Sequence, residues 1–480
     1  MEKLLDILNK ECNNRGSYIP TEELKQKCLA DNRMTEAEYQ KAIRILQNAG
    51  SIKTENDRIY LARVWQQEAY AAERLNLLLA KPPLQPVELP DDIRVGDIRL
   101  TAEQREAVRT CLNHRLTLLL APAGCGKTTV SQAIIQYAGT DRFLLCSPTG
   151  KAAKNLSDHT NLPAATVHRT LGIRRIEDFL DVEPMDDIDL ILVDEATMMT
   201  VDMLAGLLRA ASENCRIVLL GDQNQLPAVG PGNVVNELVA LGFPVAKLAQ
   251  NHRLRGNDCA LRKNVLSYDA LRWTANLDED ESFLCRYSDD TDALLNELVT
   301  EAVKRYRAGE SVQVLTFLRH DVLEINRRIQ LHLNPPVSGK MTLEYRGFVF
   351  ADSDRVILTA NDNSRGCFNG ETDILHISET GAYSVELDDG RRPEWSELDI
   401  PDHILPAYAI TVHRAQGSEY DSVLLYVPRC CRSVLHRNSF YTGISRAKQR
   451  LLLYGERNAV SFALSNPPYE RHSALAEKAA

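Results

Sequence analysis

Residues 121–129 read Ala-Pro-Ala-Gly-Cys-Gly-Lys-Thr-Thr, and they directly follow the apolar run Leu116-Thr-Leu-Leu-Leu120. This order predicts a buried strand that turns into a helix through a loop of small residues. Such a loop wraps the phosphates of a nucleotide, because its N–H groups and the helix N-terminus face their negative charge. We expect Lys127 to reach the β- and γ-phosphates and the Thr128 hydroxyl to bind Mg²⁺. The residues expected to contact the nucleotide are Ala123, Gly124, Cys125, Gly126, Lys127, Thr128 and Thr129.

Two acids follow a second apolar run, Leu190-Ile-Leu-Val193, which is typical of a buried parallel strand. At the C-terminal end of such a strand, side chains point into the crevice that holds ligands in α/β sheets. We expect Asp194 to hold Mg²⁺, directly or through water, and Glu195 to orient and activate the attacking water. Alone, the pair also fits a solvated loop. Beside the phosphate loop, it indicates hydrolysis of a nucleoside triphosphate.

The composition is that of an ordinary globular protein. The 480 residues suffice for three or four domains, and 44% of them are hydrophobic. No apolar run approaches the length of a membrane span and no signal peptide is recognisable, so we expect a cytoplasmic protein without membrane contact. The 11 cysteines include no Cys-x-x-Cys, which predicts neither a zinc site nor a disulfide framework. The net charge of −10 disfavours a protein that coats nucleic acid, but it allows a local positive channel.

Residues 1–64 have the pattern of a small separate unit. Three amphipathic stretches are predicted to be helices; Thr21 opens the second, and the capping box Thr35-Glu-Ala-Glu38 opens the third. Two short strands joined by Glu55-Asn-Asp57 follow as a hairpin. This order suggests a winged helix, which would contact DNA, a partner protein or the rest of the chain. We favour packing or protein contact, because the third helix carries charges of both signs.

The rest of the chain changes pattern several times. Residues 65–80 predict a connecting helix, and a proline-rich linker follows. From Leu100 onward, apolar strands alternate with helices, which predicts a parallel sheet, and a second α/β unit starts near Ser311. Between about Pro336 and Leu405 the pattern is that of short strands and turns. We expect the tail after Pro467 to be loosely ordered.

Further segments occur in a recognisable order. They are Leu100-Thr-Ala-Glu-Gln104, Ser147-Pro-Thr-Gly-Lys-Ala-Ala153, Thr166-Val-His168, Gly221-Asp-Gln-Asn-Gln-Leu-Pro227, Asn251-His-Arg253, Ala409-Ile-Thr-Val-His-Arg-Ala-Gln-Gly-Ser-Glu419 and Tyr441-Thr-Gly-Ile-Ser-Arg-Ala-Lys448. With the phosphate loop and the acid pair, this set resembles a superfamily 1 helicase, specifically the RecD-like branch of superfamily 1B, over about residues 95–460. The N-terminal segment also resembles the one that precedes the motor in longer RecD-like proteins.

The resemblance implies an α/β fold with two RecA-like parallel-sheet motor lobes of the P-loop NTPase class. It adds an N-terminal winged-helix-like domain and a β-rich, SH3-like insertion. The implied boundaries are 1–64 for the winged-helix-like domain, 65–95 for the connecting helix and linker, 96–254 for lobe 1 with a short pin insertion at about 171–186, 255–335 and 406–465 for lobe 2, 336–405 for the SH3-like insertion, and 466–480 for the tail.

The same resemblance assigns further contacts with ATP. Gln104 would bind the adenine edge, although Thr101-x-x-Gln104 is also a helix capping box. Gln225 would sense the γ-phosphate, although it also fits a turn-stabilising amide. Gly417 and Glu419 would contact the nucleotide from the second lobe.

Two arginines correspond to those that close on the γ-phosphate in this family. The planar guanidinium of Arg253 or Arg446 fits two oxygens of the transferring phosphoryl group. Arg446 belongs to the second lobe, so hydrolysis would require the lobes to close. The Asn-His-Arg context of Arg253 departs from the commoner aromatic-Arg form.

A third set of residues resembles those that hold single-stranded nucleic acid. Hydroxyl and backbone groups suit sugar-phosphate contacts, which need no sequence preference. These residues are Ser147, Thr149, Thr166, His168, Thr411 and His413. In the pin stretch, Phe179 and Leu180 would stack at a fork; the alternative is a plain loop.

The resemblance implies an ATP- and Mg²⁺-dependent 5′-to-3′ DNA helicase that acts on single-stranded DNA and on junctions of single- and double-stranded DNA. Repair, recombination, mobile elements or defence are the expected contexts. The alternative is a single-strand translocase subunit, docked to a partner through residues 1–64, that does not unwind alone. An inactive ATPase or binding module is a third possibility, and the intact set of Lys127, Asp194, Glu195 and Arg446 argues against it.

Overall fold

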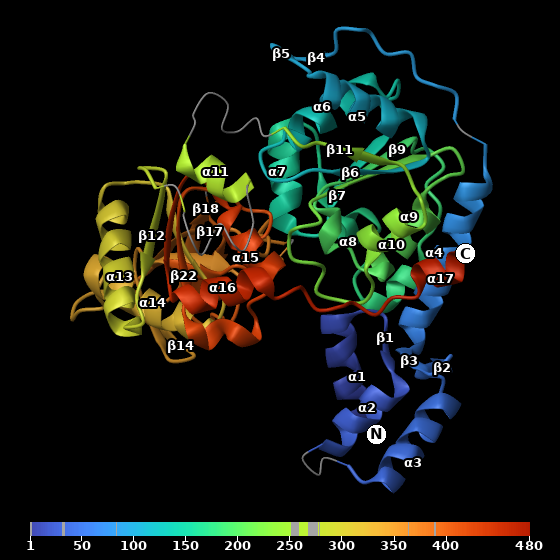
Figure 1. Cartoon of the computed structure of the whole chain (residues 1–480). Helices are drawn as coiled ribbons and strands as arrows, with labels where there is room; N and C mark the ends of the chain where they lie inside the picture. Colours follow the sequence, from blue (N-terminus) through green and yellow to red (C-terminus); the bar gives the residue numbers. More distant parts are fainter. Residues whose placement is uncertain are drawn as a thin grey trace. The chain divides into compact units, whose positions relative to one another are not determined.

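The computed structural model describes residues 2–30, 34–82, 84–250, 259–266, 277, 279–362, 364–387 and 390–480. The chain forms two compact units (Figure 1). The first comprises Met1–Pro148, Ala152–His252 and Tyr469–Ala480, and the second comprises Thr149–Lys151 and Arg253–Pro468.

The N-terminal part of the first unit contains the three expected helices and the expected hairpin. These elements, with one additional strand, are α1 (Glu2–Arg15), β1 (Tyr18–Pro20), α2 (Thr21–Leu29), α3 (Glu36–Asn48), β2 (Ile52–Glu55) and β3 (Arg58–Leu61). The Thr35 capping box is confirmed, since Glu38 donates its backbone N–H to the Thr35 hydroxyl and accepts from the Thr35 N–H. Strand β1 pairs antiparallel with β3. The winged-helix assignment itself stays a prediction.

Helix α4 (Ala62–Ala80) confirms the helix expected over residues 65–80 and begins three residues earlier than predicted. It is part of the first lobe rather than a free connector. Its buried residues Ala71, Ala72 and Leu75 share one apolar cluster with the lobe's central strands. Arg63 at its start pairs with Asp202, a fully buried carboxylate on α9 (Val201–Ala210). Two short strands, β4 (Arg94–Val95) and β5 (Ile98–Arg99), follow the helix.

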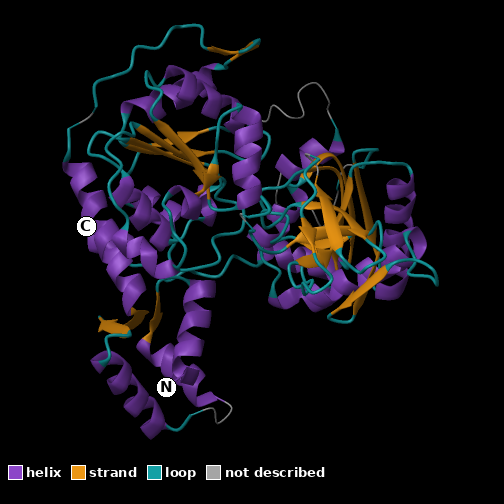
Figure 2. Cartoon of the chain, turned by 180° about the vertical axis from the view of Figure 1, so that it is seen from behind, coloured by secondary structure: helices purple, strands orange, loops and turns teal. Residues whose placement is uncertain are grey.

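A six-stranded parallel sheet forms the centre of the first lobe, in the order β11-β6-β10-β9-β7-β8. Its strands are β6 (Leu116–Leu120), β7 (Phe143–Ser147), β8 (Ala165–Thr166), β9 (Leu190–Val193), β10 (Arg216–Gly221) and β11 (Val245–Lys247). Successive residues of a strand point to opposite faces. Leu118 and Ile191 accordingly join one apolar cluster, and Leu119 and Leu192 join another. Helices cover both faces, as expected for a parallel sheet (Figures 1 and 2).

The helices of this lobe are short to medium in length. They are α5 (Ala102–Asn113), α6 (Lys127–Tyr137), α7 (Gly150–Thr160), α8 (Val167–Thr170), α9 and α10 (Val234–Ala240), with the 3₁₀ turns η2 (Ile176–Asp181) and η3 (Ala196–Met198). Helices α5 and α6 contribute Val108, Val130 and Ile134 to the second apolar cluster. No helix in the described ranges is long and apolar enough to cross a membrane.

The second unit is built on a five-stranded parallel sheet in the order β12-β23-β22-β13-β21. Its strands are β12 (Phe283–Tyr287), β13 (Val312–Thr316), β21 (Ala409–Thr411), β22 (Tyr420–Val427) and β23 (Ala447–Gly455). Its helices are α11 (Ala260–Leu266), α13 (Thr291–Arg307), α14 (Arg319–Leu333), η4 (Arg429–Ser433), α15 (Arg437–Ile444) and α16 (Arg457–Ser465). Leu298 of α13 and Ile325 of α14 are buried against the sheet.

A β-rich segment interrupts this unit between α14 and β21. The hairpin β14 (Thr342–Tyr345) and β15 (Phe348–Ala351) precedes an antiparallel sheet in the order β19-β18-β17-β16-β20. The strands of this sheet are β16 (Arg355–Leu358), β17 (Thr372–Ile377), β18 (Tyr383–Leu387), β19 (Glu394–Trp395) and β20 (Ile404–Pro406). The comparison with an SH3 fold stays a prediction.

The expectation of a loosely ordered tail is wrong. The described residues 469–480 pack on the first unit, and helix α17 (Leu475–Ala479) lies against α4 (Figure 1). Arg471 donates to the carbonyl oxygens of Ala228 and Gly232, each at 2.9 Å. The fully buried Glu68 of α4 pairs with Lys478 at 2.8 Å. These contacts join residues far apart in the sequence, so local composition carried no sign of them.

Candidate nucleotide and nucleic-acid site

The predicted phosphate loop joins β6 to α6 as expected, and α6 begins at Lys127. Gly124 and Gly126 have φ angles of +81° and +84°, a left-handed region that favours glycine. The Lys127 ammonium donates to the carbonyl oxygen of Ala121 at 3.2 Å and so folds back over its own loop. The Thr128 side chain is exposed, whereas Cys125 is buried. The loop thus has the backbone form and the exposed hydroxyl that phosphate and Mg²⁺ binding require.

The acid pair and the predicted sensor lie at the same sheet edge as this loop. Strands β6, β10 and β9 are parallel neighbours, so the residues after each strand meet at one edge. The Ala121 N–H donates to the Gly221 carbonyl oxygen at 3.0 Å, which joins the start of the loop to the end of β10. Gln225 follows β10 and is buried. The fold therefore brings together the lobe 1 residues that the sequence separates by about a hundred positions.

Glu195 has an unusual backbone conformation. Its φ of +53° lies in the left-handed region, which is rare for a residue with a side chain. Its N–H donates to the Asp194 carboxylate at 2.8 Å, and η3 begins directly after it. Strained residues of this kind concentrate at functional sites. Because of this turn, the backbone at Asp194 and Glu195 follows neither a regular strand nor a regular helix.

Gln104 forms the capping box that was one of its two predicted roles. Its side-chain oxygen accepts from the Thr101 N–H at 3.0 Å, and its own N–H donates to the Thr101 hydroxyl at 3.3 Å. The amide is buried. Contact with adenine stays a prediction and would use the amide nitrogen.

In the second lobe, Arg446 is only 3% exposed and is held by three acceptors of its own unit. It donates to the carbonyl oxygens of Thr442 at 3.0 Å and Ser418 at 3.2 Å, and to the Ser445 hydroxyl at 3.0 Å. Ser418 lies between the predicted nucleotide contacts Gly417 and Glu419. The hydrogen bond to Ser418 therefore places Arg446 next to these two residues. Arg253 lies outside the described residues.

Sequence reasoning missed the residues that hold Arg446. Ser418 and Thr442 act through backbone carbonyls, which leave no mark on residue type. Ser445 acts through its hydroxyl and directly precedes the arginine, so its position was the one available signal.

The predicted nucleic-acid contacts lie at strand ends, but not all of them present a side chain. Ser147 ends β7 beside Thr166, which ends β8. The Ser147 side chain is fully buried, so its hydroxyl is not available for a surface contact. Thr166 caps α8 by accepting from the Arg169 N–H at 3.2 Å. Thr149 is half-buried.

The two predicted histidines differ in their surroundings. The His168 ring packs edge-on against Phe179 with a centroid distance of 5.1 Å, and burial lowers the pKa of His168. His413 is exposed. Thr411 ends β21 opposite Thr316, and its hydroxyl accepts from the Arg414 N–H at 3.3 Å.

The predicted pin stretch is not a hairpin. Residues 176–181 form the 3₁₀ turn η2, and Phe179 is fully buried against α9. Stacking of Phe179 at a DNA fork is therefore contradicted in this conformation, because the ring is part of the core. Leu180 is half-buried.

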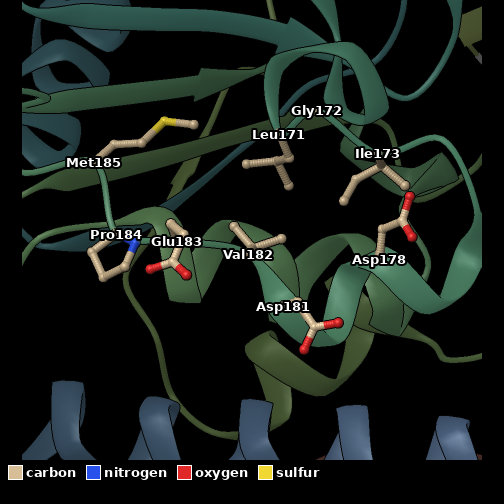
Figure 3. Close-up of a pocket in the computed structure, with 9 residues that line it drawn as sticks. All are labelled: Leu171, Gly172, Ile173, Asp178, Asp181, Val182, Glu183, Pro184 and Met185. Carbon is tan, nitrogen blue, oxygen red and sulfur yellow. The ribbon is translucent and has the colours of Figure 1, made fainter.

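A cavity of about 370 Å³ lies beside η2, as Figure 3 shows. Apolar side chains of Leu171, Ile173, Val182 and Met185 line it. The other lining residues are Gly172, Asp178, Asp181, Glu183 and Pro184. Three acids and no base disfavour the binding of a phosphate group, so this cavity is not the nucleotide site.

Residues 99–277 match the family model described as an AAA domain, and residues 406–454 match the UvrD-like helicase C-terminal domain. The chain is similar to a solved Bacteroides Pif1 bound to ssDNA, with 18% identity, a TM-score of 0.47 and coverage of 76% of this chain and 94% of that one.

Two curated relatives are more similar in sequence. The ATP-dependent RecD2 DNA helicase of Deinococcus radiodurans is 32% identical over 90% of this chain, which spans 60% of that protein's length. The RecBCD enzyme subunit RecD of Mycolicibacterium smegmatis is 30% identical over 85% of this chain and 80% of that protein. The chain belongs to the RecD-like family.

Proposed function

We propose that this chain is an ATP-dependent DNA helicase that moves 5′ to 3′ on single-stranded DNA and separates the strands of a duplex. The observation that carries the proposal is the meeting of the phosphate loop, Asp194, Glu195 and Gln225 at one edge of the lobe 1 sheet. The name of the Deinococcus relative, an ATP-dependent DNA helicase, supports the same activity. The polarity rests on the family resemblance.

Each candidate residue has a role in this proposal. Lys127 binds the terminal phosphates, Glu195 accepts the proton of the attacking water, and Arg446 stabilises the charge of the transferring phosphoryl group. Thr128 and Asp194 supply the oxygen ligands that Mg²⁺ prefers. When bound, the ion would neutralise charge on the phosphates.

The experiment compares two partial duplexes that differ only in the polarity of the single-stranded tail. The full chain is given each duplex with ATP, and both strand separation and ATP turnover are followed; a blunt duplex and the Lys127→Ala variant are the controls. Separation from the 5′ tail alone supports the proposal. Separation from the 3′ tail alone refutes the polarity, and no DNA-stimulated turnover refutes the motor.

A second candidate is a single-strand translocase that needs a partner complex, docked through residues 1–64, to unwind DNA. The burial of Phe179 favours it, because the stretch expected to form a pin is a turn built into the core. The Mycolicibacterium relative is named as a subunit of an enzyme, which also fits. DNA-stimulated ATP turnover without strand separation from either tail would select this candidate.

A further inference from the structure

We infer that lobe 2 contains a binding site for a zinc ion, formed by His320, Asp321, Cys430 and Cys431. One ligand atom each from His320, Asp321 and Cys430 lies within 4.8 Å of the others. The Cys431 sulfur lies 3.5 Å from the second carboxylate oxygen of Asp321. Imidazole, carboxylate and two thiols form a four-ligand set that zinc accepts in proteins.

The fold explains why these residues meet although the Cys431 and Asp321 positions are 110 residues apart. Strands β13 and β22 are parallel neighbours in the lobe 2 sheet. Helix α14 follows β13 and carries the His-Asp pair in its first turn, and η4 follows β22 and carries the two cysteines. Because parallel neighbours end at the same sheet edge, both pairs arrive there. The lack of a Cys-x-x-Cys motif in the sequence therefore does not exclude such a site.

Asp321 gives this cluster a buried carboxylate, although Arg319, Arg429 and Arg432 flank the four residues in the sequence. Asp321 is 7% exposed, and its ion pair among the described residues is with His320, at 2.8 Å. Cys431 is fully buried beside it. Glu456 adds another carboxylate next to η4, where it accepts from the Arg429 N–H at 2.8 Å. A divalent cation would compensate this buried negative charge.

The spacing requires a small adjustment. With zinc–sulfur distances of about 2.3 Å and zinc–nitrogen distances of about 2.0 Å, the ligand atoms of a tetrahedral shell lie roughly 3.3–3.8 Å apart. Movements of about 1 Å would close the group of His320, Asp321 and Cys430 to that size, and His320 and Cys430 are exposed. The Cys431 sulfur lies outside this group and would have to turn from its contact with Asp321 to join it. Cys430 and Cys431 would lose their thiol protons to solvent on binding, as zinc ligation requires. The ion would tie η4 to the start of α14.

The test uses the full chain, purified without chelators and without nucleotide. Zinc content is measured by mass spectrometry, and cobalt is then titrated as a spectroscopic probe of tetrahedral thiolate ligation. We expect roughly one ion per chain and a thiolate-to-cobalt charge-transfer band. His320→Gln and Cys430→Ser alter exposed side chains, so folding should persist, and a thermal melt checks it.

Each of these variants should weaken metal binding by more than the roughly 10- to 100-fold that loss of an outer-shell partner costs. Cys259→Ser, which changes a partly exposed cysteine of the same unit, should bind metal as the unaltered chain does. Absence of a charge-transfer band, or an unchanged band in Cys430→Ser, would overturn the site. In either case the cluster would be a set of hydrogen bonds at the N-terminus of α14 only.

Discussion

The two motor lobes hold their predicted phosphate-binding cations in different ways. In lobe 1, Lys127 is half-exposed and donates to a carbonyl oxygen of its own loop at 3.2 Å. In lobe 2, Arg446 is 3% exposed and is bound by three acceptors. Hydrogen bonds to charged groups are worth about 1.5–3 kcal/mol each. If both side chains bind phosphate as proposed, Lys127 would give up one of these hydrogen bonds and Arg446 would give up three.

This difference suggests how ATP would be coupled to movement. If Arg446 completes the catalytic site, the lobe must exchange the three internal bonds for bonds to the nucleotide. A site that assembles only after a conformational step ties hydrolysis to that step. The following predictions test whether the lobes are unequal in this sense.

Replacement of Lys127, the half-exposed cation of lobe 1, should have the largest effect on ATP turnover. Lys127→Ala should reduce ATP turnover to background, because the loop loses its charge contact with the terminal phosphates. Steady-state ATP hydrolysis with single-stranded DNA measures it. Lys247→Ala, an exposed lysine of the same lobe, is the matched control. Normal turnover in Lys127→Ala would remove the phosphate-loop assignment.

Replacement of the buried cation should reduce turnover roughly 10³-fold, the lower end of the range for an arginine that stabilises phosphoryl transfer. Arg446→Ala should retain ATP binding, since lobe 1 supplies most of that site. Binding of a fluorescent ATP analogue and kcat separate the two effects. Arg450→Ala, which removes a partly exposed arginine of the same lobe, should behave as the unaltered chain. If Arg446→Ala weakened ATP binding as much as it lowered kcat, the proposed difference between the lobes would be refuted.

Replacement of Glu195, the predicted base of lobe 1, separates ATP hydrolysis from ATP binding. Glu195→Gln should bind ATP normally and hydrolyse it roughly 10²- to 10³-fold more slowly, because it keeps the shape of the side chain but cannot accept a proton. Single-turnover hydrolysis is the appropriate measurement. Glu213→Gln provides an exposed control in the same lobe. Unchanged hydrolysis would refute the base role.

Acid should weaken the segment that leads to Arg446. His436 caps α15 by accepting from the Ser439 N–H, and burial, with His413 nearby, lowers the pKa of His436 to about 4. The folded lobe then disfavours a proton that the unfolded chain accepts, so stability is present above pH 6.5 and falls as the pH drops toward 4. The shift corresponds to at most about 3 kcal/mol.

Thermal unfolding measured across this pH range, with His436→Asn as the comparison, tests that expectation. Asparagine keeps an N-cap acceptor without titrating. The variant should lose part of the acid sensitivity. An identical pH profile would show that other groups control the acid response of lobe 2.

A substitution in the tail, residues 469–480, should have the smallest effect. It tests the stability of the first unit only. Burial lowers the pKa of Arg471 to about 10, so the guanidinium remains charged at neutral pH while it binds backbone carbonyls. Arg471→Ala should lower the free energy of unfolding by roughly 2 kcal/mol, because those acceptors lose their partner. Glu470→Ala, an exposed neighbour, should have little effect. Chemical denaturation of both variants measures the two free energies of unfolding, and equal values would contradict the expectation.

Prediction from sequence worked best where structure depends on neighbouring residues. The helix start at Thr35 and the strand-loop-helix at Lys127 follow from side chains within a few positions, so they were predictable. The parallel sheets were predictable because strands buried on both faces read as apolar runs. Phe179 shows the limit, because nothing local distinguishes a ring exposed at a fork from a ring packed against α9.

The sequence by itself determined the backbone form of the loop before Lys127, since Gly124 and Gly126 adopt the left-handed conformation that glycine allows. The order of the motifs also determined the family. Only the tertiary structure decided that Arg446 is buried, that the tail from Tyr469 belongs to the first unit, and that His320 meets Cys430. The physical reason is that these features depend on which strands are neighbours and which carbonyls face inward. Those relations arise only when distant segments pack together.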